Sequence, residues 1–126
     1  RLAAKDAYEQ AGIGPEDVNL VELHDCFATA EMLHYENLGL CKDGEAGRMI
    51  DVGHVELGGT VPVNVSGGLL SKGHPLGATG IANIYEVCTH LRGEAGARQV
   101  EGAKIGMTHV IGLGTACGIH ILEKVN

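Results

Sequence analysis

The sequence predicts a mixed α/β sheet with helices on both of its faces. Helix-like and strand-like segments alternate along the chain, which is the pattern of such sheets. The strand-like segments are short and rich in Val, Ile and Leu, as expected of strands that are buried on both sides. With 126 residues, the chain is long enough for one compact domain.

In the first part of the chain, residues 2–11 bring alanines together at helical spacing, and the segment ends at Gly12. It therefore predicts a helix. Residues 18–23 form a short apolar run that predicts a buried strand, and residues 28–38 return to a helical pattern. Since layouts of this kind normally begin with a strand, we expect the first strand of the sheet to be lacking.

The second part opens with a polar, glycine-rich stretch, residues 39–60, which predicts a long loop. Loops of this length are often functional. Residues 61–65 predict a second strand, and residues 77–91 predict a helix with one apolar face. Two final strands are expected at residues 105–111 and 118–125.

Composition disfavours several classes of function. The formal net charge of −7 opposes binding to nucleic acids and to anionic membrane surfaces. No apolar run approaches the roughly 20 residues that span a bilayer. The four cysteines are widely spaced and form no C-x-x-C pair, which favours reduced thiols in the cytoplasm, or in a peroxisome if the source is eukaryotic.

Three segments that follow predicted strands carry residues with chemical potential. The first, His24-Asp25-Cys26-Phe27, places a base, a carboxylate and a thiol side by side at the end of a strand, where ligands of open α/β sheets tend to bind. A buried core histidine next to a small buried thiol is the alternative interpretation.

The other two segments are rich in glycine. Residues 64–80 include His74, which Pro75 presents from a stiff turn before a helix; an incidental histidine in a connector is the alternative. Residues 109–117 contain Gly112-Leu113-Gly114 between two strands. Backbone N–H groups there are suited to binding an oxyanion, whereas a tight hairpin is the alternative.

Taken together, these segments resemble the thiolase family over essentially the whole chain. The fingerprint Asn64…Gly67-Gly68…Gly73-His74-Pro75-x-Gly77-Ala78-x-Gly80 is highly specific for that family. Ordinary thiolases carry Asn-Glu-Ala-Phe where this chain has His-Asp-Cys-Phe, a form typical of the sterol carrier protein x and lipid-transfer-protein branch. As in that branch, the terminal motif lacks a catalytic cysteine, and the resemblance implies that Cys26 supplies the second thiol.

The resemblance implies cleavage of a 3-ketoacyl-CoA by CoA, giving an acyl-CoA and acetyl-CoA or propionyl-CoA, in the degradation of lipids or sterol side chains. His74 would activate the nucleophilic cysteine and donate to the thioester oxyanion, with His24 as a supporting donor. Cys26 would protonate the enolate, and the backbone N–H around Gly114 would stabilise the other oxyanion. Coenzyme A is a co-substrate, and no permanently bound cofactor is expected.

The resemblance also implies that residues 1–126 are an incomplete C-terminal thiolase domain. The nucleophilic cysteine belongs to the N-terminal half of the family, and none of the four cysteines matches its context. Without a first, central strand, the two parts of the sheet would lack a common neighbour and expose unpaired edges. We therefore expect an inactive fragment whose partner is the N-terminal half, within an enzyme that forms a homodimer or tetramer.

Three alternatives remain open. A retro-aldolase on the same scaffold would shorten the side chains of steroid CoA esters. A non-catalytic segment would only bind or dimerise. A zinc site would use His24, Cys26 and His74, but their spacing does not follow the usual short ligand pairs, so no metal is expected.

Overall fold

A three-stranded sheet in the order β1-β2-β3 forms the centre of the molecule. The structure, a computed structural model, describes residues 1–114 and 116–125. Strands β1 (Leu20–Glu22) and β2 (Ile105–Gly112) run parallel, and β3 (Ala116–Glu123) is antiparallel to β2. The predicted mixed α/β sheet is thus confirmed.

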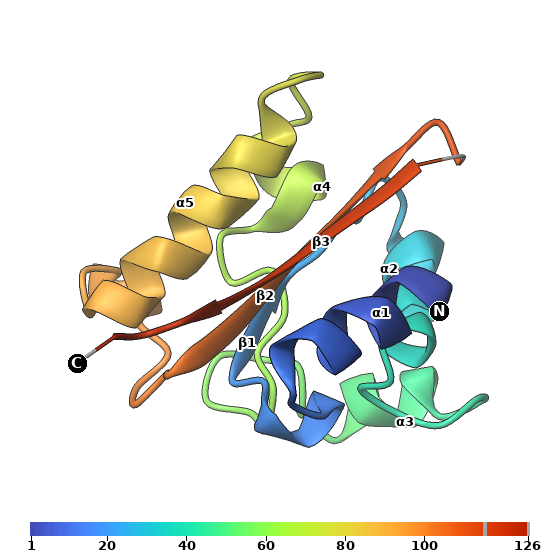
Figure 1. Ribbon diagram of the computed structural model, residues 1–126, viewed down its shortest axis with the longest axis horizontal. Coiled ribbons are helices and arrows are strands. Elements are labelled where there is room, and N and C mark those ends of the chain that lie inside the picture. The colour runs from blue at the N-terminus through green and yellow to red at the C-terminus, as the bar shows by residue number, and fades with distance from the viewer. Residues whose placement is uncertain (115, 126) are drawn as a thin grey trace.

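Helices cover both faces of this sheet (Figure 1). On one face lie α1 (Leu2–Ala11), α2 (Ala28–Asn37) and α3 (Ala46–Asp51). On the other lie α4 (Gly68–Lys72) and α5 (Thr79–Arg92). Two short 3-10 helices, Pro15–Asp17 and Gly96–Arg98, occupy connections.

The side chains of β1 alternate between two hydrophobic clusters, as the pleat of a strand requires. Leu20 packs with Val87 and Leu91 of α5. Val21 points to the opposite face and joins the cluster formed with helices α1 to α3. At the same level, a Cβ on Gly106 of β2 would lie 2.5 Å from Val87 Cγ1, so a glycine is needed for α5 to approach the sheet this closely.

Two sequence-based expectations about the middle of the chain are wrong. Residues 61–65 form only an isolated bridge, between Val21 and Val63. Pro62 lacks an N–H, which limits ladder formation, and the N–H groups of Val61 and Val63 instead donate to His54 and Val55. The stretch 39–60, expected as a loop, contains the short helix α3.

The two parts of the sheet were expected to lack a common neighbour and to expose unpaired edges. Instead, β1 and β2 pair directly with each other. Leu20 lies opposite Gly106, and Glu22 lies opposite Thr108. The Asn19 side chain extends the contact by accepting hydrogen bonds from the N–H groups of Lys104 and Ile105, at 2.8 and 2.9 Å. The backbone groups that we expected to remain unpaired therefore satisfy one another.

Candidate active site

The first and third segments singled out in the sequence meet at one edge of the sheet. Because β1 and β2 are parallel, their carboxyl ends lie at the same edge. His24 and Cys26 follow β1, and the turn at Leu113 and Gly114 follows β2. This edge is where ligands of open α/β sheets usually bind.

A cavity of about 680 Å³ lies at this edge, and all four residues expected in the site line it: His24, Cys26, His74 and Gly114. Helix α2 contributes one wall through Ala30, Leu33, His34 and Asn37. Cys41, Cys88 and Cys117 are not among the described residues that line this cavity.

The imidazoles of His24 and His74 lie edge to face, with ring centroids 4.9 Å apart. His24 is buried, whereas His74 is exposed. Burial is the main cause that lowers the pKa of His24; the nearby His74 lowers it further, and Asp25 opposes the shift. At neutral pH His24 is therefore an uncharged imidazole with one N–H group, which suits a hydrogen-bond donor more than a base.

The His74 side chain is hydrogen-bonded to Thr79, the first residue of α5. His74 Nδ1 lies 2.7 Å from Thr79 Oγ1. The Thr79 hydroxyl donates to the carbonyl of Pro75 at 3.2 Å. The imidazole is thus hydrogen-bonded to the first turn of α5, which an incidental histidine in a connector would not require.

Asp25 locks the end of β1 to the glycine-rich segment. Its Oδ1 accepts a hydrogen bond from the N–H of Leu69 at 2.7 Å. A Cβ on Gly68 would lie only 2.0 Å from Asp25 Oδ2, so a side chain at this position is excluded. The close approach of α4 to β1 therefore accounts for one glycine of the fingerprint.

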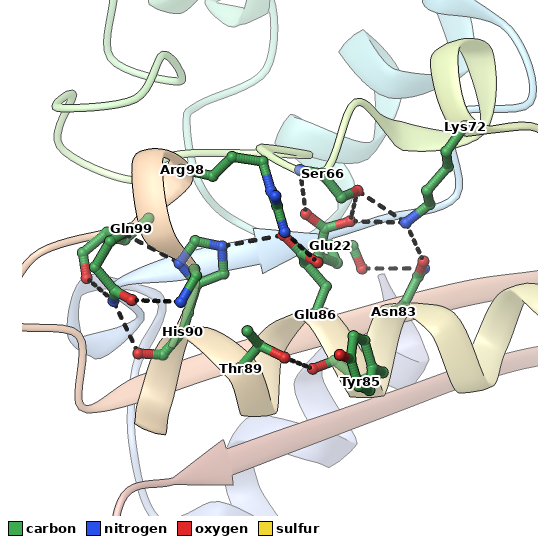
Figure 2. Close-up of polar contacts among 12 residues, drawn as sticks. Glu22, Ser66, Lys72, Asn83, Tyr85, Glu86, Thr89, His90, Arg98 and Gln99 are labelled. Carbon is green, nitrogen blue, oxygen red and sulfur yellow. Dashed lines mark hydrogen bonds and ion pairs between the residues drawn. The ribbon is translucent and has the colours of Figure 1, made fainter. Parts of the chain in front are cut away.

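A second anchor is the fully buried carboxylate of Glu22, shown in Figure 2 with its partners from two other segments. Ser66 donates to it through its N–H at 3.1 Å and its hydroxyl at 2.5 Å, and Lys72 Nζ lies 3.3 Å from Oε2. Asn83 of α5 bonds both to Lys72 and to the carbonyl of Glu22. Burial raises the pKa of Glu22, while Ser66 and Lys72 pull it down.

Two histidines that the sequence analysis did not single out lie behind the site. His34 and His109 have ring centroids 4.4 Å apart, and His109 Nδ1 accepts a weak hydrogen bond from the N–H of His24 at 3.5 Å. Burial, followed by His34 and His24, lowers the pKa of His109 to about 3. The sequence showed only one histidine in a predicted helix and one in a predicted strand, and such single histidines are ordinary features of cores.

The cysteines separate by environment. Cys26 is an exposed thiol at the cavity, so the interpretation of a small buried thiol is wrong. Cys117 is also exposed, on the edge strand β3. Cys41, expected in a polar loop, packs against the core, and burial is the main cause that raises its pKa. Cys88 is half-buried on α5.

The turn between β2 and β3 has the geometry of a tight hairpin and also lies at the cavity. Leu113 and Gly114 both have positive φ, 49° and 73°, as a tight hairpin needs, and both line the cavity. Thr115 lies outside the described residues. Within the described ranges, there is no group of three or more His, Cys, Asp or Glu side chains suited to a metal ion. No helix in those ranges is long and apolar enough to cross a membrane.

Comparison with known proteins adds independent findings. The family model described as "Thiolase C-terminal domain-like" matches residues 1–124. The chain is 57% identical over 114 residues to "Sterol carrier protein 2" of Rattus norvegicus, covering 90% of this chain and 21% of that protein. It is 52% identical over 123 residues to "Acetyl-CoA acetyltransferase" of Methanothermobacter thermautotrophicus, covering 97% of this chain and 32% of that protein.

A solved structure, "Ltp2-ChsH2(DUF35) aldolase", is also similar, with a TM-score of 0.87 and 28% sequence identity over 99% of this chain and 32% of its own. The chain therefore spans only about a fifth to a third of the length of these proteins. Since the family model extends over nearly the entire sequence, the chain belongs to the thiolase C-terminal domain-like family.

Proposed function

We propose that this chain is the acid–base part of an acyl-CoA thiolase that cleaves 3-ketoacyl-CoA with CoA. The observation that carries the proposal is the single cavity lined by His24, Cys26, His74 and Gly114. These groups come from three separate segments of the chain, and each matches a need of the reaction. The similarity to an acetyl-CoA acetyltransferase supports the same class of chemistry.

Thiolysis needs an activated thiolate, an acid for the departing enolate, and donors for two oxyanions. In the proposed reaction, a cysteine thiolate from the N-terminal half adds to the keto carbon. The carbon–carbon bond then breaks, and its electron pair passes to the enolate of a short-chain CoA thioester. Coenzyme A finally takes the acyl group from the cysteine.

His74 takes the thiol proton of the nucleophile and lies next to His24. Once protonated, His74 donates to the thioester oxyanion, and the neutral imidazole of His24, whose pKa is lowered by burial, is the supporting donor. Cys26 is exposed at the cavity, so its thiol is accessible to protonate the enolate carbon. The backbone N–H at Gly114 donates to the oxygen of the attacked ketone.

The nucleophile, the CoA site and the oligomer, a homodimer or tetramer, belong in this proposal to the longer protein. Its support is the length of the relatives, of which this chain covers 21% and 32%. The similarity to sterol carrier protein 2 suggests lipid or sterol-side-chain acyl groups as substrates.

The test is an assay of the whole enzyme, this chain together with its N-terminal half, against 3-ketoacyl-CoA substrates of increasing chain length. We expect CoA-dependent loss of the ketoacyl-CoA absorbance and formation of a shortened acyl-CoA. An enzyme that leaves every 3-ketoacyl-CoA intact would contradict the proposal.

A retro-aldolase is the second candidate, favoured by the structural similarity to an aldolase. Such an enzyme would cleave a β-hydroxyacyl-CoA without CoA and without a covalent acyl intermediate. Supplying both substrate types to the same preparation separates the two reactions, because only thiolysis consumes free CoA.

A further inference from the structure

Thr79 is a buried residue, 3% exposed, at the first position of α5. It lines the same cavity as His74, and its Oγ1 lies 2.7 Å from His74 Nδ1. Distance alone does not say which atom donates. A second contact of Thr79, to the Pro75 carbonyl, bears on the direction.

A threonine hydroxyl has one proton and two acceptor lone pairs. The Pro75 carbonyl, which can only accept, lies 3.2 Å from this hydroxyl, one helical turn back. A hydroxyl that donates to this carbonyl accepts from His74, and Nδ1 then carries the ring proton. A neutral imidazole has a single ring proton, which leaves His74 Nε2 with a free lone pair.

We infer that Thr79 is a positioning residue that fixes His74 in the Nδ1–H tautomer and so makes Nε2 the nitrogen that acts as a base. The hydrogen bond at one ring nitrogen generally decides what the other can do. The reverse arrangement, in which Thr79 donates to Nδ1, would place the proton on Nε2 and leave no base there.

The chemical consequence rests on the proposed thiolase function, whereas the tautomer itself does not. In the reaction, Nε2 accepts the thiol proton of the nucleophile and the thiolate keeps the electron pair of its broken S–H bond. The resulting imidazolium carries N–H on both nitrogens. Its Nδ1–H continues to donate to Thr79, so the ring keeps its orientation when it charges.

The sequence fingerprint gave no role to this position, since it reads Gly77-Ala78-x-Gly80 with Thr79 as the variable residue. A second threonine in α5 provides a matched control. Thr89 Oγ1 donates to the Tyr85 carbonyl at 2.8 Å, again one turn back, and is buried to a similar degree. No described histidine nitrogen is bonded to its hydroxyl.

The first experiment measures the ¹⁵N chemical shifts of His74 by NMR in the whole enzyme, at a pH where the ring is neutral. We expect a protonated Nδ1 and an unprotonated Nε2 in the wild type and in Thr79→Ser. In Thr79→Val the Nε2–H tautomer should gain population. A wild-type ring protonated on Nε2, or an unchanged ring in Thr79→Val, overturns the inference.

The second experiment compares turnover. General acid–base catalysis and tautomer control are worth on the order of 100-fold or more, so Thr79→Val should lower kcat by about 100-fold with KM within a few-fold. Thr79→Ser should restore most of kcat, and Thr89→Val should leave it unchanged. Equal losses in Thr79→Ser and Thr79→Val would show that the γ-methyl packing matters and not the hydroxyl, which also overturns the inference.

The two experiments fail independently of the proposed function. An enzyme without thiolysis activity but with the Nδ1–H tautomer would refute the function and keep the role of Thr79. A thiolase whose His74 carries its proton on Nε2 would keep the function and refute that role. If Thr79→Val does not fold, the wild-type NMR measurement still decides the tautomer.

Discussion

The imidazole rings of His74 and His24 pack in a T-shaped arrangement, with a centroid distance of 4.9 Å and an interplanar angle of 87°. The two residues come from different segments, one after β1 and one after α4. The segments that carry them are joined by the hydrogen bond from the N–H of Leu69 to Asp25 and by the ion pair of Lys72 with Glu22. Asp25 and Glu22 lie within two positions of His24, and both bonds connect them to the segment that carries His74.

Replacing His74 tests the centre of the proposed site. We expect His74→Ala to lower turnover of the whole enzyme by about 100-fold or more, because an oxyanion donor and the activation of the nucleophile are lost together. His54→Ala is the control, since His54 is exposed and does not line the cavity. A His74→Ala enzyme within a few-fold of wild type would remove His74 from the mechanism.

Cys26 should be the second catalytic thiol. Cys26→Ser should abolish exchange of the α-protons of acetyl-CoA with solvent while the fold is retained, because a hydroxyl is a far weaker acid than a thiol. The exchange is followed by NMR in deuterated buffer. Cys117→Ser, which changes another exposed thiol, serves as the control. Damage from Cys117→Ser and not from Cys26→Ser would mean that the terminal motif has been misaligned.

The isolated chain should show no thiolase turnover. A nucleophile must face His74 and Cys26, and Cys26 cannot act as nucleophile and acid in the same step. Cys41, Cys88 and Cys117 are not among the described residues lining the cavity. Purified chain is mixed with ketoacyl-CoA and CoA, and the absorbance is compared with a blank without protein. Saturable turnover would identify a nucleophile within these residues.

His109 should make the protein sensitive to acid. Its pKa is about 3 in the folded chain against a reference of 6.5, so between these values the unfolded state binds more protons. The free energy of unfolding contributed by this residue is therefore complete above pH 6.5 and is lost as the pH falls towards 3.

Urea unfolding at several pH values tests this dependence. His109→Gln should show a smaller acid loss than wild type, although His24 and His34, whose pKa values are also lowered by burial, keep part of it. His54→Gln, at an exposed position, should follow the wild-type curve. A His109→Gln curve parallel to wild type would show that this imidazole does not govern acid unfolding.

The ion pair of Glu22 and Lys72 should stabilise the site. Lys72→Met leaves a buried carboxylate short of a partner, which costs about 2 kcal/mol. Since Lys72 lowers the pKa of Glu22, its removal raises that pKa, and the loss should shrink as the pH falls and the carboxyl group becomes protonated.

A double-mutant cycle with Glu22→Gln isolates this interaction. The double variant should lose less stability than the sum of the single variants in chemical denaturation, and Lys42→Met, at an exposed lysine, should be neutral. Strictly additive losses would mean that the pair contributes nothing beyond its separate residues.

Several elements follow from local sequence alone. The helix at Leu2–Ala11 has the predicted bounds, and its end at Gly12 has the left-handed conformation that glycine adopts most readily. The helix α5 and the strands β2 and β3 also lie within a few residues of their predicted positions. Their periodicity and their turn residues are encoded by neighbouring amino acids.

For the candidate site, too, some features could be predicted from the sequence and others only from the structure. The identities of His24, Cys26, His74 and Gly114 came from motifs, because a motif records which residue types stand at which spacing. The sequence by itself therefore determined the family and the candidate residues. Only the tertiary structure decided that His24 is buried and Cys26 exposed, that residues 61–65 make no ladder, and that Thr79 bonds to His74. Burial and hydrogen-bond partners are set by segments distant along the chain, and pairwise contacts of that kind leave no local pattern to read.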